Sequence, residues 1–125
     1  MRLSLVVPTY EERANLGPLV TRITASLAGP DYEIIVVDDD SPDGTTEEAA
    51  ILANSHPMRV IKREGIRGLG SAILEGFRNS KGDTLGVIDA DLQHPPEVIS
   101  KLATAIGNGA DIAIASRYAP GGGIE

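Results

Sequence analysis

The chain has 125 residues, a formal net charge of −7 and no cysteine. Its length suits one domain with a modest core, and the lack of cysteine excludes disulfides, Cys-ligated metals and thiol nucleophiles. The acidic balance, with one Phe, three Tyr and no Trp, argues against nucleic acid as a partner. No apolar run approaches the ~20 residues that span a bilayer and no signal peptide opens the chain, so we expect a soluble, cytoplasmic domain.

The first half of the chain alternates apolar runs with helical patterns. Residues 3–7 predict a strand that ends at Pro8, and residues 11–28 predict a helix because apolar side chains recur every three or four positions. Residues 33–37 are apolar without alternation, which is typical of a central strand covered on both faces. The Thr-Thr-Glu-Glu segment at 45–48 matches a capping box and predicts a short helix.

The second half repeats this alternation. The patterns predict strands at 58–61, 84–88 and 111–116, and helices at 68–79 and 95–106. Apolar strands separated by helices indicate a parallel sheet whose right-handed crossovers place helices on both faces. We therefore predict an α/β fold of three layers, α/β/α, with a mainly parallel sheet. In such sheets ligands bind beyond the carboxyl ends of the strands.

Two aspartates follow the strand predicted at 84–88. In extended backbone, residues two apart point the same way, so Asp89, Asp91 and Gln93 are expected to converge on one side. Two carboxylates and an amide oxygen are hard ligands that suit Mg²⁺ or Mn²⁺. The alternative is that one Asp caps the following helix while the other is solvated. The position after a buried strand favours the metal.

Three consecutive aspartates, residues 38–40, follow the strand predicted at 33–37. They cannot all ionise in a confined space without compensating charges or hydrogen bonds. Asp39 is a candidate for binding the ribose hydroxyls of a nucleotide, as acidic residues after a strand do in dinucleotide folds. A calcium loop is rejected, because Ala50 stands where an EF-hand needs a bidentate Glu. We assign Asp43 and Gly44 to a turn.

These motifs together resemble those of the family 2 glycosyltransferases with a GT-A fold, closest to the dolichyl-phosphate and polyprenyl-phosphate mannosyltransferases. The matching stretches follow one another along nearly the whole chain, at residues 7–16, 36–45, 68–72, 89–97 and 116–118. The stretches 39–45 and 89–96 are the most specific. The chain departs from the family pattern at Glu11, where the family usually has Asn, and at 64–67, where it commonly has a Lys.

The resemblance implies a binding site for a nucleotide-sugar donor, made of Pro8, Tyr10, Glu12, Val37, Asp39, Asp89, Ala90, Asp91 and Arg117. It implies that Asp89 and Asp91 are catalytic, and that Asp91 and Gln93 bind the Mg²⁺ or Mn²⁺ ion. Arg117 would contact the donor or the lipid phosphate. Residues 1–118 would form a truncated GT-A domain, the N-terminal donor-binding part of a longer transferase, followed by a Gly-rich tail at 119–125.

The implied reaction is transfer of a hexose, mannose from GDP-mannose, to a polyprenyl or dolichyl phosphate by metal-assisted inverting single displacement. That acceptor would place the enzyme at the cytosolic face of a membrane, as a peripheral protein. Two alternatives stay open: a UDP-sugar-dependent member of the same family, and a nucleotide-sugar-binding fragment that is inactive alone. The usual fold has a later strand beside the fourth one; without it, we expect an exposed sheet edge that is covered by self-association.

Overall fold

Strands and helices alternate along the part of the chain that the computed structural model describes, residues 2–27, 31–65, 68–88 and 90. In chain order the elements are β1 (Arg2–Thr9), α1 (Arg13–Ser26), β2 (Asp31–Asp38), α2 (Thr45–Leu52), β3 (Met58–Lys62), α3 (Leu69–Arg78) and β4 (Thr84–Val87). The helix predicted at 95–106 and the strand predicted at 111–116 lie outside the described residues.

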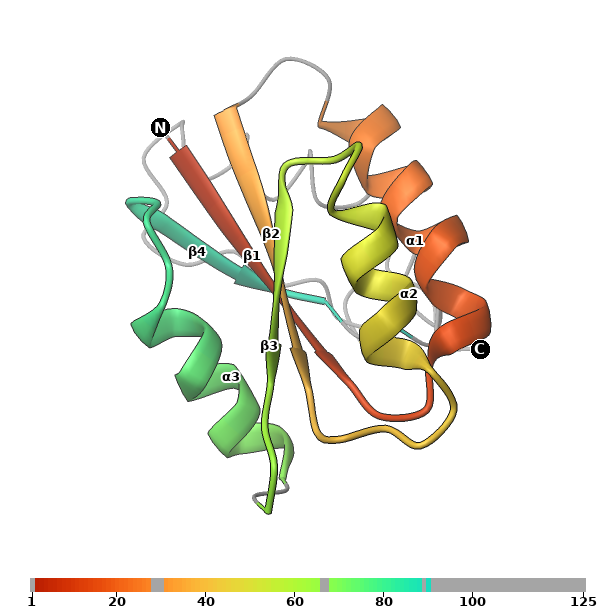
Figure 1. Cartoon of the computed structure of the whole chain (residues 1–125). Coiled ribbons are helices and arrows are strands. Elements are labelled where there is room, and N and C mark those ends of the chain that lie inside the picture. The colour runs from red at the N-terminus through yellow and green to blue at the C-terminus, as the bar shows by residue number, and fades with distance from the viewer. Residues whose placement is uncertain (1, 28–30, 66–67, 89, 91–125) are drawn as a thin grey trace, which may run out of the picture.

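The four strands form one parallel sheet in the order β3-β2-β1-β4. The register places Leu5 of β1 beside Ile34 of β2 and Gly86 of β4. Helices α1 and α2 cover one face of the sheet and α3 covers the other (Figure 1). The predicted three-layer α/β/α arrangement is therefore confirmed.

Two apolar clusters fill the spaces between these layers. The cluster under α1 and α2 includes the apolar side chains that recur every three or four positions along residues 11–28: Leu16, Leu19, Val20, Ile23 and Leu27. The cluster under α3 is smaller and holds Val6, Ile35, Val37 and Ala72. Because successive strand residues face opposite sides, β1 and β2 supply apolar residues to both clusters. This explains why their sequences show no alternation.

Strand β1 continues through Pro8 to Thr9, so the predicted end at Pro8 is wrong. The carbonyls of Arg2 and Val6 accept hydrogen bonds from residues of the β4 segment, whereas the carbonyl of Thr9 accepts one from Asp39 after β2. Even-numbered residues of β1 therefore direct their backbone groups toward β4. A backbone N–H at position 8 would point toward β4, beyond the last paired residue of that strand. The absence of this N–H in Pro8 therefore costs no hydrogen bond to β2.

The predicted start of α1 and the predicted cap of α2 are also corrected. Glu11 has a φ of 55°, which no right-handed helix accommodates, so α1 begins at Arg13 and not at residue 11. The predicted capping box is absent, because the N-cap of α2 is Gly44, with a φ of 90° and no side chain. The Asp43 carboxylate instead accepts hydrogen bonds from the backbone N–H and the hydroxyl of Thr45. The turn assigned to Asp43 and Gly44 is thereby confirmed.

Strand β4 is less covered than its apolar sequence predicts. Leu85 and Val87 are 45% and 41% exposed, and both lie on the face that carries α3. Helix α3 packs on β1 and β2 and leaves these two side chains partly open. Among the described residues, β4 has a paired neighbour only in β1.

Candidate functional site

The loops that follow β1 and β2 lie side by side at the carboxyl edge of the sheet (Figure 1). We call them the carboxyl rim, residues 9–12 and 38–45. Four hydrogen bonds join the two loops. The backbone N–H groups of Asp39, Glu11 and Glu12 donate to the Thr9 carbonyl (3.1 Å), Ser41 Oγ (2.8 Å) and Thr45 Oγ1 (3.1 Å), and Thr9 Oγ1 donates to the Asp38 carboxylate (2.7 Å). The rim is therefore one cross-linked unit with a fixed shape.

Asp38 is the buried centre of the carboxyl rim. Its carboxylate accepts hydrogen bonds from Thr9 Oγ1, Ser41 N–H, Ser41 Oγ and Thr46 Oγ1, all between 2.7 and 2.9 Å. Burial alone would raise the pKa of Asp38, but the bonds from Ser41, Thr46 and Thr9 outweigh it and hold the pKa below 3.8. This carboxylate is ionised and satisfied by the protein, so its role is to hold the two loops together.

Asp39 points to the opposite face of the sheet, as the strand alternation requires. One carboxylate oxygen accepts a hydrogen bond from Arg63 Nε at 2.7 Å, and the other accepts one from the backbone N–H of Gly68 at 3.0 Å. Arg63 follows β3 and Gly68 precedes α3, so Asp39 ties three elements together. The pair is buried, with side-chain exposures of 8% for Asp39 and 5% for Arg63.

Asp40 lies at the surface and has a third kind of environment. Its φ is 55°, a left-handed conformation that Asp tolerates better than most residues. Its carboxylate lies 3.4 Å from Lys62 Nζ, and this contact, with the charge of Glu64, raises the pKa of Lys62. Each of the three consecutive aspartates thus has its own cation or set of donors, which confirms the compensation that the sequence required.

Four of the residues implied for donor binding lie in the rim or next to it. Pro8 and Val37 are adjacent on paired strands, and Asp39 follows Val37 by two residues. Tyr10 is 38% exposed at the end of β1. The Val37 side chain is fully buried in the cluster under α3, so only its backbone remains for a ligand.

Glu12 and Ala90 are the other two implied residues that the structure describes, and Glu12 also belongs to the rim. Glu12 is half-buried at the start of α1, where its carboxylate accepts a hydrogen bond from Asn15 Nδ2 at 2.7 Å. Ala90 is buried in the cluster under α1 and α2. The remaining implied residues lie outside the described part of the chain: Asp89, Asp91, Gln93 and Arg117.

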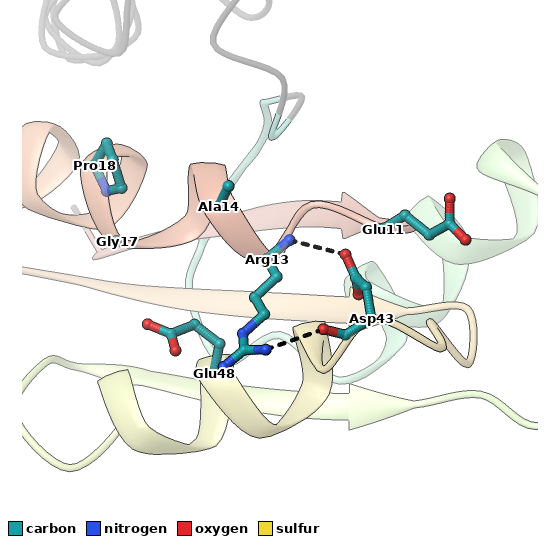
Figure 2. Close-up of a pocket in the computed structure, with 7 residues that line it drawn as sticks. All are labelled: Glu11, Arg13, Ala14, Gly17, Pro18, Asp43 and Glu48. Carbon is teal, nitrogen blue, oxygen red and sulfur yellow. Dashed lines mark hydrogen bonds between the residues drawn. The ribbon is translucent and has the colours of Figure 1, made fainter.

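A hollow of about 490 Å³ lies beside the rim, between α1 and the start of α2 (Figure 2). Arg13 spans it, donating from its backbone N–H and from Nη1 to the side chain and carbonyl of Asp43, both at 3.4 Å. Hydrogen bonds from Thr45 hold the pKa of Asp43 below its usual value. The hollow is lined by none of the residues implied for donor binding, so we do not assign the donor to it.

The described residues hold neither a metal-binding cluster nor a membrane-spanning helix. Within 2–27, 31–65, 68–88 and 90, no group of three Asp, Glu or His side chains is arranged to hold a metal ion. The hard oxygen ligands Asp91 and Gln93 fall outside those ranges. Over the same ranges, none of the helices combines the length and apolar character needed to cross a bilayer.

Arg63 and Gly68 are the residues of this region that sequence reasoning missed. The acidic run at 38–40 indicated that a basic partner was needed, and Arg63 stands directly after the strand that pairs with β2. That adjacency was the available signal. Register alone does not reveal that the Arg63 side chain crosses to Asp39, because its direction depends on where α3 begins.

The fold places the protein in the GT-A, Rossmann-like class of glycosyltransferases. A mannosyltransferase of Pyrobaculum calidifontis, solved in complex with GDP-Man and Mn²⁺, superposes with a TM-score of 0.63 at 26% identity, over 82% of this chain and 31% of that one. The sequence model described as glycosyl transferase family 2 matches residues 4–125. The chain belongs to that family.

Curated relatives define the neighbourhood within the family. The chain is 55% identical over 125 residues to a dolichol-phosphate mannosyltransferase of Pyrococcus furiosus, covering all of this chain and 36% of that protein. It is 44% identical to the dolichol-phosphate mannosyltransferase of Saccharomyces cerevisiae over 126 residues, 98% of this chain and 47% of the relative. The chain thus spans between a third and a half of the length of these relatives.

Proposed function

We propose that the protein is a hexosyltransferase that moves mannose from GDP-mannose to a polyprenyl or dolichyl phosphate. The observation that carries this proposal is the 55% identity over the whole chain to a dolichol-phosphate mannosyltransferase. The GDP-Man and Mn²⁺ in the Pyrobaculum structure support the same donor and a divalent ion. The carboxyl rim supports it as well, since ligands of parallel α/β sheets bind at this edge.

The proposed donor site consists of Pro8, Tyr10, Glu12, Val37, Asp39, Asp89, Ala90, Asp91 and Arg117. Asp91 and Gln93 would hold Mg²⁺ or Mn²⁺, for which carboxylate and amide oxygens are suitable ligands. When bound, the ion neutralises negative charge on the diphosphate leaving group. We propose residues 1–118 as the donor-binding domain and 119–125 as a tail.

The proposed acceptor explains why the site needs little proton transfer. A polyprenyl phosphate is already ionised at neutral pH, so a general base adds little to its nucleophilicity. The demanding step is departure of the nucleoside diphosphate, which charge stabilisation favours. We propose a single displacement with inversion at the sugar carbon, at the cytosolic face of the membrane that holds the acceptor.

The proposal is tested by calorimetry of GDP binding with and without Mn²⁺, followed by a transfer assay with GDP-mannose and a polyprenyl phosphate. Asp91→Ala should abolish the Mn²⁺-dependent part of the affinity. The matched control is Asp31→Ala, an exposed carboxylate at the amino end of β2, which should leave binding unchanged. Equal affinity of the unaltered chain with and without Mn²⁺ would contradict the metal assignment.

The transfer assay also separates the alternatives. Binding without transfer would mean that the chain is a donor-binding part that is inactive alone, in keeping with its partial coverage of the relatives. Transfer from UDP-glucose in preference to GDP-mannose would mean that the donor is a UDP-sugar, whereas the family and the proposed acceptor would stay the same.

We further propose that the chain self-associates through the β4 edge. Leu85 and Val87 expose apolar surface on the face of β4 that carries α3, and among the described residues β4 pairs only with β1. Exposed apolar patches and unpaired strand edges both promote association between chains. The average mass from light scattering should rise with protein concentration, and Leu85→Lys with Val87→Lys should suppress the rise. A monomeric mass at every concentration would refute this proposal.

A further inference from the structure

The Arg63 guanidinium is buried between the end of β2 and the start of α3. It donates from Nε to Asp39 (2.7 Å), from Nη1 to Ser71 Oγ (3.0 Å) and from Nη2 to the Gly68 carbonyl (3.1 Å). The backbone N–H of Arg63 also donates to the Asp38 carbonyl at 2.8 Å, which fixes the point from which the side chain starts. Both ends of this side chain are therefore held by hydrogen bonds.

Arg63, Gly68 and Asp39 form a closed ring of hydrogen bonds. Arg63 binds one oxygen of Asp39 and the carbonyl of Gly68, and the N–H of Gly68 returns to the other oxygen of Asp39. Gly68 has a φ of 136°, which residues with a side chain rarely adopt. The ring thus depends on a glycine at this point, and it leaves the Asp39 carboxylate one fixed orientation.

A carboxylate held in this way can still accept hydrogen bonds from a ligand. Each oxygen has two lone pairs, and the ring uses one of them on each oxygen. The adjacent guanidinium balances the charge of Asp39. The pair can therefore accept hydrogen bonds from hydroxyl or N–H groups of a nucleoside without strongly repelling the diphosphate attached to it.

We propose that Arg63 is a positioning residue for donor recognition: it fixes and neutralises Asp39 so that this carboxylate binds the nucleoside part of the donor. The inference rests on the proposed function, which places Asp39 in the donor site. Arg63 itself does not reach the donor. Turning toward a ligand would break its three side-chain bonds and leave Asp39 buried without a cation.

The test measures binding of GDP and of inorganic pyrophosphate, each with Mn²⁺, to four forms of the chain: unaltered, Arg63→Gln, Asp39→Asn and the double variant. Arg63→Gln should weaken GDP binding at least tenfold and leave pyrophosphate binding unchanged. The double variant should bind GDP as Asp39→Asn does, because Arg63 acts only through Asp39. A merely structural role would weaken both ligands.

Two more variants complete the design. Arg63→Lys keeps the charge but not the fork of donors, so its GDP affinity should fall between those of the unaltered chain and Arg63→Gln. If thermal melting shows that Arg63→Gln does not fold, Arg63→Lys takes its place as the variant that tests the positioning role. The control is Lys62→Gln, the same loss of charge one residue earlier in an exposed pair, which should not change GDP binding.

The outcomes separate the two proposals. If the unaltered chain binds neither GDP nor UDP, the proposed function fails, whatever Arg63 does. If it binds GDP and both Arg63 variants bind equally well, only the positioning role is refuted. Additive losses in the double variant, or equal losses for GDP and pyrophosphate, would also overturn the positioning role.

Discussion

At the scale of single residues, three neighbouring aspartates have three different functions in the fold. Asp38 holds the loops of the carboxyl rim together, Asp39 joins Arg63 and the start of α3, and Asp40 forms a surface pair with Lys62. Alternation along the strand explains the division, because Asp38 and Asp39 face opposite sides of the sheet. The position of each aspartate at the end of β2 therefore decides the role of its carboxylate in the fold.

Asp38→Asn should lower the free energy of unfolding by about 2–4 kcal/mol at pH 7. An Asn amide keeps one acceptor oxygen, and its NH₂ group would face donors such as Ser41 N–H and Thr46 Oγ1. Urea unfolding measures the change. Asp31→Asn, at an exposed site, should change stability by less than about 0.5 kcal/mol.

The same carboxylate predicts how stability depends on pH. The pKa of Asp38 is lower in the folded chain than the unfolded value near 3.8. Its contribution is therefore complete above pH 3.8 and is lost as the pH falls through the folded pKa. Unfolding free energies measured from pH 5 to pH 2 should decline less steeply in Asp38→Asn than in the unaltered chain. Parallel curves would contradict the assignment.

Glu11 carries a backbone strain that a single substitution should relieve. Its φ of 55° is unfavourable for Glu, and only its backbone N–H is used in bonding to Ser41. Glu11→Asn should stabilise the chain by about 0.5–1 kcal/mol, since Asn tolerates this conformation. Glu47→Asn, in the first turn of α2, should have the opposite sign because Asn is a poorer helix former. A loss of stability in Glu11→Asn would contradict the expected backbone strain at this position.

At the scale of elements, the sequence patterns predict every strand and helix of the described residues, and the errors lie mainly at the ends. The start of α1 depends on the Glu11–Ser41 bond, and the start of α2 on the conformation of Gly44. The first is a contact between loops thirty residues apart, whereas the second belongs to the local turn at Asp43 and Gly44. A local pattern cannot contain the contact between Glu11 and Ser41, whereas the apolar faces of α1, β1 and β2 are local features that the sequence predicts.

Helix α3 offers a matched pair of glycines that tests its packing. A Cβ added to Gly76 would lie 2.5 Å from Val6 Cγ1 of β1, whereas one added to Gly70 would meet nothing within 4 Å. Gly76→Ala should destabilise the chain by about 1–3 kcal/mol, because α3 would have to move off the sheet. Gly70→Ala should stabilise it by up to about 1 kcal/mol through helix propensity. Denaturant unfolding of both variants gives the comparison, and equal signs would contradict it.

At the scale of the whole molecule, the candidate site is assembled from segments far apart in sequence. The sequence predicted that acidic residues gather at one edge, because parallel strands end on the same side. It did not predict the Arg63–Asp39–Gly68 ring, since that ring depends on how β3 and α3 are placed relative to β2. The topology alone predicts at which edge of the sheet the acidic residues gather, whereas the packing of β3 and α3 decides which residues bind them.

Because the proposed donor site joins the loops after β1 and β2, donor binding should stabilise the entire domain. At a ligand concentration of 100 times its Kd, the gain is about 2.7 kcal/mol, or a rise in Tm of roughly 10 °C for a chain of this size. Thermal melting with GDP-mannose and Mn²⁺ should show this rise, and UDP-glucose at the same concentration a smaller one. EDTA should abolish most of the rise, because the proposed metal ion would couple the diphosphate to the protein. An equal rise in Asp91→Ala would contradict that coupling, and a larger rise with UDP-glucose would change the donor.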